Sequence, residues 1–293
     1  MARVLAPLIA LVLGLCVLAG AAGAAVAPVF VQVVQFAADE VGSFDQGLFD
    51  PGAERADGPQ GPTEFDSDLG EVQVFDVLAD GTLEPAATGV AADVWNQFVR
   101  MVGADVAGGS IIQYRAGDAP RSDLLAYVYQ DLDPQYWTLA VNLSTADDPQ
   151  LMIATLIHEY AHVFSFDDDD FDRKATSCAT LDLFEGCAAP DSHLYEFYDR
   201  FWSDYTDAVD VENLDPDAAW EFYLDNEDDF VSDYAATNLG EDFAESFMTF
   251  VIEESFEGPG VAAQKLRFFE KYPELVDLRE HIREEFAAEL GLR

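Results

Sequence analysis

The sequence predicts an α+β fold. Three short runs typical of strands lie between residues 111 and 143, and segments with helical spacing fill most of the chain after residue 148. Strands that precede helices, rather than alternate with them, are typical of this fold class. Between the two parts lies an apolar helix that carries the pattern His158-Glu159-Tyr-Ala-His162.

Residues 1–24 are expected to be a secretory signal peptide. Arg3 supplies a positive start, the segment from Leu5 to Leu18 is almost wholly apolar, and small residues follow with a cleavage option after Ala24. We therefore expect a secreted or otherwise extracytoplasmic protein.

An uncleaved membrane anchor is the alternative for this N-terminal segment. Residues 5–34 contain no charged side chain and are long enough to span a bilayer. Lipid modification at Cys16 is disfavoured, because Leu15 stands where a small residue is needed. Apart from this alternative anchor, we expect no contact with a membrane.

The chain is strongly acidic, with 57 Asp and Glu residues against 14 Lys and Arg and a formal net charge of -43. Phosphate contacts need a basic surface, so nucleic-acid partners are excluded, and anionic membrane surfaces are excluded for the same reason. Two interpretations of the acidity stay open. One is solubility, including adaptation to high salt, and the other is attraction of basic substrates.

Cys178 and Cys187 are the cysteines that remain after signal cleavage. In an exported chain such a pair is expected to form a disulfide, with two reduced thiols as the alternative. Zinc ligation by these residues is disfavoured, because the His-Glu-x-x-His pattern offers a better nucleus for a metal site.

Residues 25–70 are expected to form an acidic, flexible lead-in, because Asp, Glu, Gly and Pro dominate its later part without sustained periodicity. A single domain over residues 71–293 follows and is large enough to bury a core. It is expected to begin with regular structure at Val72–Leu78 and a helix at Ala91–Val102. Three strands follow, at Ile111–Arg115, Leu124–Gln130 and Trp137–Leu143.

Asp148 followed by Pro149 is a typical helix start, with Asp as the N-cap and Pro at the first helical position. The helix is expected to reach about Phe166, with apolar residues on nearly every side, as in an internal helix. In such a setting His158 and His162 are costly unless they are paired or bind a metal. Two imidazoles four residues apart project from one face of a helix and can bind one Zn²⁺.

An acidic run from Asp167 to Asp170 comes directly after this helix. We interpret it as a solvated turn, because it lacks the spaced oxygen ligands of a Ca²⁺ site. A loop over residues 174–192 carries the two cysteines. Helices are expected beyond it at His193–Val209, Asp217–Leu224, Leu239–Glu254, Val261–Lys271 and Glu274–Leu290.

A hydrolytic zinc site needs a third protein ligand, and Glu241 is the first candidate. Glu241 and Glu245 share one helix face, so one can bind the metal while the other holds a ligand imidazole through its remaining N–H. A second interpretation stays open, in which Glu241 closes a capping box with Asn238 at the helix N-terminus.

The segment Tyr234-Ala-Ala-Thr-Asn-Leu-Gly-Glu241-Asp-Phe-Ala-Glu245, taken with the His-Glu-x-x-His helix, resembles the gluzincin metallopeptidases. It is similar in particular to the lethal-factor-like catalytic domain and to related secreted bacterial zincins. The resemblance covers these two helices and, more loosely, the helical tail. It implies a zincin-like fold, in which a small mixed sheet and the active-site helix are followed by a mainly helical C-terminal subdomain.

The same resemblance makes Glu241 the third zinc ligand and points Tyr234 at the zinc-bound oxygen. The alternative for Tyr234 is a packed ring with a satisfied hydroxyl. Thermolysin-like enzymes carry Asp at the place of Glu245, so the sequence departs from their pattern at the residue that would orient the imidazole.

Other candidate ligands have less support. Asp168 occupies the third-ligand position of the metzincin pattern, but Ser165 replaces the Gly that its turn needs. His193 and His281 each stand alone, without ligand spacing.

These residues predict a zinc metallopeptidase. Glu159, next to a ligand in a buried helix, is suited to act as general base toward a zinc-activated water, while zinc and Tyr234 stabilise the oxyanion. Trp137–Leu143 is a candidate edge strand that receives substrate in extended form. We expect a peptide or protein substrate and a monomer.

Two other interpretations stay open. In the first, a secreted binding or surface protein keeps zinc for structure without turnover, although a structural site would not require Glu159. In the second, the pattern is accidental in an acidic exported chain. Metal content and peptide cleavage distinguish the three.

Overall fold

The computed structural model describes residues 62–206 and 208–292, all of which belong to one compact unit of the chain. The predicted signal peptide, the alternative anchor at residues 5–34 and the lead-in as far as residue 61 lie outside the described residues. None of the described helices is long and apolar enough to cross a membrane.

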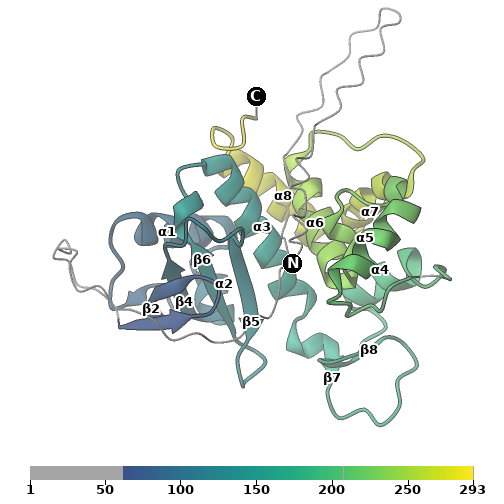
Figure 1. The fold of residues 1–293 in the computed structure, drawn as a ribbon, viewed down its shortest axis with the longest axis horizontal. Helices are drawn as coiled ribbons and strands as arrows, with labels where there is room; N and C mark the ends of the chain where they lie inside the picture. The colour runs from purple at the N-terminus through teal and green to yellow at the C-terminus, as the bar shows by residue number, and fades with distance from the viewer. Residues whose placement is uncertain (1–61, 207, 293) are drawn as a thin grey trace, which may run out of the picture. The chain divides into compact units, whose positions relative to one another are not determined.

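A small mixed sheet occupies the first part of the described chain, and helices dominate the second, so the α+β prediction is confirmed (Figure 1). The strands of this sheet are β1 (Thr63–Asp66), β2 (Gly70–Val77), β3 (Leu83–Glu84), β4 (Ile111–Gly117), β5 (Ala126–Gln130) and β6 (Trp137–Asn142). They lie in the order β1-β2-β4-β6-β5, and β3 pairs with β2. β4 and β6 are parallel, and the other neighbours are antiparallel.

The expectation that Trp137–Leu143 forms an edge strand is wrong. β6 lies between β4 and β5, and all 6 of its residues are buried. A strand with neighbours on both sides and both faces covered is apolar along its whole length, as this one is. The edge of the sheet on this side is β5, which contacts the following helix.

Regular structure also begins earlier than expected, because β1 and its turn into β2 fall within the segment assigned to the lead-in. Asp66 holds this turn: its Oδ1 atom accepts hydrogen bonds of 2.9 Å from the N–H groups of Asp68 and Leu69. A further helix, α2 (Ala104–Ser110), was not predicted. Its 7 residues are too few to display a helical period.

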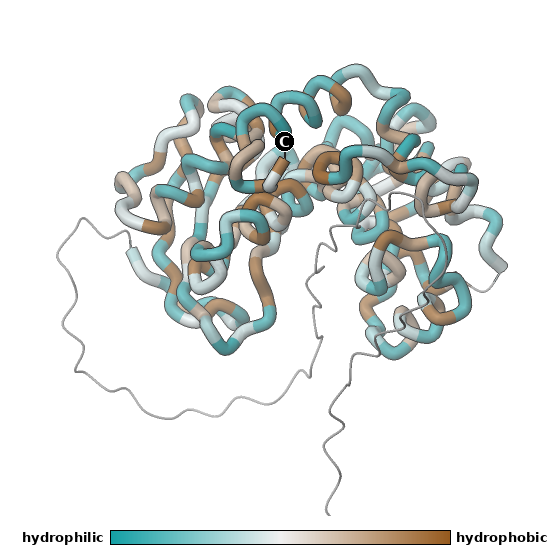
Figure 2. Tube along the Cα trace, turned by 90° about the horizontal axis from the view of Figure 1, so that it is seen from above, coloured by the Kyte–Doolittle hydropathy of each residue, from teal (hydrophilic) through white to brown (hydrophobic). Residues whose placement is uncertain are grey.

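The two faces of the sheet are covered by different elements. On one face α1 (Gly89–Val102) packs Trp95 against Tyr114 of β4, with ring centroids 5.2 Å apart. On the opposite face Leu69 of the β1–β2 turn packs with Ala140 of β6 in a small core. Hydrophobic and hydrophilic residues alternate along much of the chain (Figure 2), which gives most elements one apolar side.

The helices of the second part are α3 (Pro149–Ser165), α4 (His193–Phe201), α5 (Pro216–Asp225), α6 (Leu239–Ile252), α7 (Val261–Phe268) and α8 (Pro273–Glu285). α3 begins as predicted, because Asp148 accepts a hydrogen bond of 3.1 Å from the N–H of Leu151 and Pro149 takes the first helical position. α3 contacts both β5 and α6 and therefore joins the sheet to the helical part (Figure 1). Four helices end earlier than expected: α4 at Phe201, α6 at Ile252, α7 at Phe268 and α8 at Glu285.

The expected loop over residues 174–192 contains two unpredicted strands, β8 (Asp182–Leu183) and β9 (Gly186–Ala188). They form a separate small sheet with β7 (Phe171–Asp172), which lies just before the loop. Strands of two or three residues leave no recognisable alternation in a sequence. The predicted disulfide between Cys178 and Cys187 is present in this region.

Phenylalanines hold α3 and α6 together. The ring of Phe164 in α3 lies 4.9 Å from that of Phe247 and 5.7 Å from that of Phe243, both in α6. Phe197 of α4 packs against Phe243 at 5.4 Å. Aromatic pairs at these distances contribute stability in addition to that from the apolar area they bury. These contacts therefore fix the two helices firmly relative to each other.

α6 also takes part in a buried ion pair that no feature of the sequence predicts. Asp242 Oδ2 lies 2.6 Å from Nζ of Lys265 in α7, and both side chains are fully buried. Trp202 donates a hydrogen bond of 2.8 Å to the same oxygen. Nζ of Lys265 also lies 3.8 Å from the centre of the Phe230 ring, a favourable place for a cation.

Two arginines of α8 donate hydrogen bonds to carbonyl oxygens at the C-terminal end of α6. Arg279 donates hydrogen bonds of 2.6 Å to the carbonyl oxygens of Phe250 and Glu253, and Arg283 donates one of 2.8 Å to that of Val251. The last carbonyls of a helix have no partner inside the helix, and positive charge is favourable there. α8 therefore stabilises α6 from its C-terminal side.

Candidate metal centre

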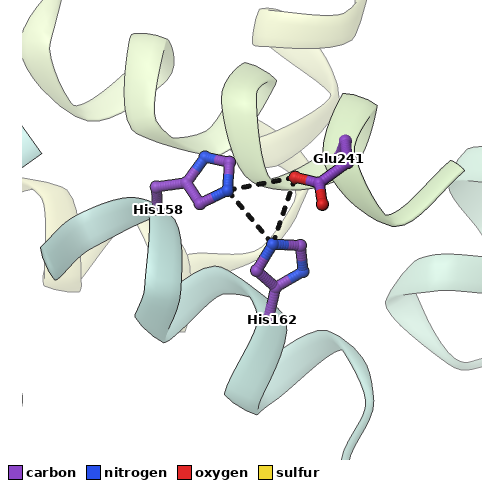
Figure 3. Close-up of side chains that lie close together, drawn as sticks. All are labelled: His158, His162 and Glu241. Atoms are coloured by element: carbon purple, nitrogen blue, oxygen red, sulfur yellow. Dashed lines mark hydrogen bonds and ion pairs between the residues drawn. The ribbon is translucent and has the colours of Figure 1, made fainter. Parts of the chain in front are cut away.

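α3 directs two imidazoles to one point. His158 and His162 lie four residues apart, so both project from the same side of the helix (Figure 3). Their Nε2 atoms are 3.1 Å apart. His158 is buried and His162 partly buried, so the pair lies largely out of contact with water.

Glu241, in the first turn of α6, points at the same place from the facing helix (Figure 3). Its Oε2 atom lies 3.1 Å from Nε2 of His158 and 3.3 Å from Nε2 of His162. The helix is capped by Asn238, whose side-chain oxygen accepts a hydrogen bond of 2.9 Å from the N–H of Glu241. Asn238 thus supplies the cap, and the carboxylate of Glu241 faces the imidazoles.

The three converging atoms are all acceptors. Nδ1 of His158 lies 2.8 Å from Oε1 of Glu245, so the N–H of the neutral ring donates there and Nε2 turns a lone pair toward His162 and Glu241. Oε2 of Glu241 is a buried atom without a hydrogen-bond donor among the described residues. Buried acceptors that face one another need a cation between them. His158, His162 and Glu241 can therefore hold a metal ion.

Among the described residues this is the one group of three or more His, Cys, Asp or Glu side chains arranged to hold a metal ion. A scan against models of protein families and searches of curated proteins and of solved structures found no match for the chain. The site is therefore characterised by its own geometry.

Protons compete with a metal at this site. Burial alone would lower the pKa of His158, but the hydrogen bonds that the protonated ring makes with Glu241 and Glu245 outweigh burial and raise the pKa well above its ordinary value. Burial alone would raise the pKa of Glu241, but the neighbouring charges of His162 and His158 hold it well below its usual range. Without a metal, a proton on the imidazoles balances the carboxylates.

Glu159 is buried beside the imidazoles, with 4% of its surface exposed. Burial raises the pKa of its carboxyl, against the lowering effects of His158, His162 and a hydrogen bond from the N–H of Val128. Val128 belongs to β5, so Glu159 lies between the candidate ligands and the edge strand of the sheet. A carboxyl with a raised pKa in this position is suited to accept and release a proton.

Tyr234 reaches the group from a turn of 3-10 helix, η4 (Tyr234–Ala236), which comes just before α6. Its ring centroid lies 5.9 Å from that of His158. Burial, followed by the charge of Glu241 and a hydrogen bond with it, raises the pKa of Tyr234 well above its ordinary value. The hydroxyl therefore stays protonated and acts as a hydrogen-bond donor next to Glu241.

Ser232 supports both His158 and Tyr234, and the sequence did not single it out. Its hydroxyl donates a hydrogen bond of 2.7 Å to Oε2 of Glu245, whose other oxygen holds His158. It also accepts one of 3.0 Å from the N–H of Ala235, next to Tyr234. Ser232 lies in an irregular segment without a periodic pattern, so only the folded chain reveals this connection.

Gly240 lets α6 approach the end of α3 closely. A Cβ atom at this position would lie 3.2 Å from two ring atoms of Phe166, the residue that follows α3. Such a contact is tighter than an aromatic ring normally accepts, so a larger residue would push the first turn of α6 outward. Glu241 is the next residue and would move with it.

Asp168, the metzincin-like candidate, is not part of this group. Its Oδ1 atom lies 2.7 Å from Nε of Arg173. The acidic run forms a single turn of 3-10 helix, η2 (Asp168–Asp170), capped by the side chain of Asp167. These residues are not among the described residues that come together as a possible metal-binding group.

The two lone histidines also have other partners. His193 lies at the start of α4, and its Nε2 atom is 3.4 Å from a carboxylate oxygen of Glu274. His281 in α8 donates a hydrogen bond of 2.8 Å to the carbonyl oxygen of Arg100. Both histidines therefore join helices to their neighbours and lie outside the candidate metal centre.

An open cleft of about 1360 Å³ extends to this centre, and both Tyr234 and Glu241 line it. On the side of the sheet it is lined by the β1–β2 turn and by the loop between β4 and β5. On the side of the helices it is lined by the first half of α5 and the residue Leu214 before it. A ligand in the cleft therefore reaches the residues that surround the candidate metal position.

Proposed function

We propose that this protein is an exported zinc-dependent peptidase of the gluzincin type. The observation that carries the proposal is the convergence of His158 Nε2, His162 Nε2 and Glu241 Oε2 within 3.1–3.3 Å of one another, with the buried carboxyl of Glu159 beside them. Two imidazoles and one carboxylate are a frequent ligand set of catalytic zinc.

The spacing of the three atoms favours zinc over harder cations. Tetrahedral zinc has bonds of about 2.0–2.1 Å to nitrogen and oxygen, which separates its ligand atoms by about 3.3 Å. The three distances here agree with that value. Ca²⁺ and Mg²⁺ take more ligands and prefer oxygen, so a site with two imidazoles suits them poorly. Three protein ligands also leave a fourth position for water or substrate.

Each residue of the site has a role in hydrolysis of a peptide bond. When bound, zinc polarises a water molecule and a substrate carbonyl. Glu159 takes a proton from the attacking water and passes it to the leaving amine, which its raised pKa favours. Tyr234 keeps its proton and donates a hydrogen bond to the carbonyl oxygen as that oxygen gains negative charge.

Glu245 and Ser232 keep this arrangement in place. Glu245 accepts the Nδ1–H of His158, which fixes the tautomer and leaves Nε2 free to bind the metal. Ser232 holds the second oxygen of Glu245 and the backbone next to Tyr234. The Asp found here in thermolysin-like enzymes is replaced by Glu245, and the longer side chain still reaches the imidazole.

The edge strand β5 supports a peptide substrate. Among the described strands β5 pairs only with β6, and its residue Val128 contacts Glu159. An extended peptide that adds to such an edge gains backbone hydrogen bonds regardless of its side chains. Its scissile carbonyl would then lie near Glu159. The disulfide between Cys178 and Cys187 favours an exported protein, because disulfides persist in oxidising compartments.

The test compares the wild-type protein with Glu159→Gln, which keeps the shape of the side chain and removes its basicity. Zinc content is measured by elemental analysis, and cleavage of casein and of a mixed peptide library is followed by mass spectrometry. We expect equal zinc content in both proteins and cleavage by the wild type alone. Zinc without cleavage in the wild type would favour the binding or surface protein, and absence of bound zinc would contradict both functions.

A further inference from the structure

The cleft beside the metal centre has an acidic side. Asp68 of the β1–β2 turn, Glu71 of β2, and Asp118 and Asp123 of the β4–β5 loop line it, and all four are exposed. Arg121 is the one basic residue among its described lining residues. Carboxylates on the same side of a cleft reinforce one another and attract positively charged groups.

These carboxylates stand on two segments that are held in place. The buried side chain of Asn142 accepts a hydrogen bond of 3.0 Å from the N–H of Ala119 and donates to the carbonyl oxygens of Ala119 and Leu124, at 3.0 and 2.9 Å. Asp66 holds the β1–β2 turn in the same manner. The acidic side is therefore formed before a ligand arrives, which reduces the entropic cost of binding.

The helical side of the cleft is apolar at the start of α5, whereas Asp233, Thr237 and Asn238 make it polar near η4 and α6. Leu214 is 85% exposed and Trp220 is 49% exposed, and Pro216 and Ala219 line the cleft between them in sequence. Large apolar side chains grouped on an open cleft favour an apolar ligand. This observation is independent of the charges on the other side.

Glu241 connects these two sides to the metal centre. It lines the cleft, and its buried Oε2 atom has no hydrogen-bond donor among the described residues. A ligand held between the acidic and apolar sides therefore lies directly beside the atoms that would bind zinc.

We propose that the cleft selects cationic amphipathic peptides, with Lys or Arg side chains against Asp118 and Asp123 and an apolar side chain against Leu214 and Trp220. The inference rests on the proposed function and names the substrate class of that same site. A strongly acidic protein attracts cations over its whole surface, so the charges of the cleft need to be separated from the rest by substitution.

The experiment measures binding with the zinc-loaded Glu159→Gln variant, so that no peptide is cut. Four labelled peptides of equal length combine Lys or Gln at the polar positions with Leu or Ser at the apolar positions, and fluorescence anisotropy gives each Kd. The peptide with Lys and Leu is expected to bind most tightly. Added salt is expected to weaken the preference for Lys while leaving the preference for Leu, because salt screens exposed charges.

Two substitutions in the same background assign these preferences to the cleft. Asp118→Asn with Asp123→Asn is expected to reduce the advantage of Lys over Gln by about two- to fivefold for each charge removed. Leu214→Ser is expected to reduce the advantage of Leu over Ser and leave that of Lys unchanged. Asp225→Asn and Leu224→Ser are matched controls, because both residues are exposed in α5 but do not line the cleft.

Equal binding of all four peptides, or preferences that persist in the cleft variants, would overturn the inference. Its failure is distinguishable from failure of the proposed function, because the wild-type protein is incubated with the same four peptides and cleavage is read separately. Cleavage without a preference contradicts the substrate class alone. Preferential binding without cleavage contradicts the peptidase alone.

Discussion

Nδ1 of His158 lies 2.8 Å from Oε1 of Glu245, across the interface between α3 and α6. This contact fixes the orientation of the His158 ring, so that its other nitrogen, Nε2, faces His162 and Glu241. The geometry of the candidate metal centre therefore depends on the packing of α3 against α6, and the two residues of this contact are 87 positions apart in the sequence. Changes that disturb either helix should therefore appear as changes in metal affinity.

Ser232→Ala tests the support behind this pair. The change removes the hydrogen bond to Oε2 of Glu245. Loss of a residue that holds a metal ligand through hydrogen bonds typically lowers metal affinity by about 10–100-fold. We expect zinc affinity, measured by competition with a chelator, to fall in that range. Ser192→Ala is the control: Ser192 is also buried, but it caps α4, so its loss should lower stability by about 1 kcal/mol without changing zinc affinity. Equal effects of the two changes would contradict a specific role for Ser232.

Glu241→Ala and Asp168→Ala identify the third ligand. Removal of Glu241 leaves two imidazoles without their carboxylate, so zinc should be lost on dialysis. Asp168 is paired with Arg173 outside the group, and its removal should leave zinc content unchanged. Elemental analysis of both dialysed proteins gives the answer, and loss of zinc from the Asp168 variant alone would move the chain to the metzincin pattern.

Zinc affinity should rise with pH. The pKa of His158 is raised in the metal-free protein, so below that pKa a metal has to displace a proton from the ring. The same raised pKa stabilises the metal-free fold at low pH, and this contribution is lost as the pH rises through the folded-state pKa. Titrations with zinc from about pH 6 to 8.5 should give increasing affinity across the range. A constant affinity would mean that the imidazole is already neutral at the lowest of these pH values.

Breaking the buried pair of Lys265 and Asp242 should lower the free energy of unfolding more than breaking a surface pair. Lys265→Met leaves the carboxylate of Asp242 buried without its partner, which typically costs about 3–5 kcal/mol in the free energy of unfolding. Lys271→Met breaks an exposed pair with Glu196 and should cost at most about 1 kcal/mol. Urea denaturation of both variants, and of Lys265→Met combined with Asp242→Asn, measures the coupling. If the double variant is no more stable than Lys265→Met, the unpaired carboxylate of Asp242 is not the cause of the lost stability.

Asp66→Asn should destabilise the β1–β2 turn in a pH-dependent manner. Burial opposes ionisation of Asp66, but hydrogen bonds from Tyr127 and from the N–H groups of Leu69 and Asp68 lower its pKa below 3.8. A lowered pKa contributes stability above the unfolded-state pKa, and this contribution is lost as the pH falls through the folded-state pKa. The variant should be about 1–2 kcal/mol less stable at pH 7, and the difference should shrink below pH 4. A difference that is the same at both pH values would show that the charge of Asp66 is unimportant.

The sequence predicts elements whose signals are local. α3 starts where Asp148 and Pro149 indicate, and His158 and His162 meet because four residues make about one turn of a helix. Glu241 was singled out by the resemblance of its segment to the gluzincins and by the helix face that it shares with Glu245, and the fold brings it to the imidazoles.

The features that the sequence missed depend on contacts between distant segments. The order of strands in a sheet is decided by long-range pairing, so the sequence alone does not reveal that β6 lies inside the sheet, although its six buried residues are typical of an internal strand. Ser232 and Lys265 carry no local pattern, and their roles arise from partners in other elements. β7, β8 and β9 are too short to show alternation.

The hydrogen bonds from Arg279 and Arg283 to the end of α6 have a consequence for biosynthesis. A ribosome releases His158 first, Glu241 later and the two arginines near the end of the chain. Until α8 emerges, the last carbonyls of α6 lack these partners. We therefore expect nascent chains that end before residue 279 to bind zinc weakly although they contain every ligand. On the proposed function, this order would delay activity until translation is complete.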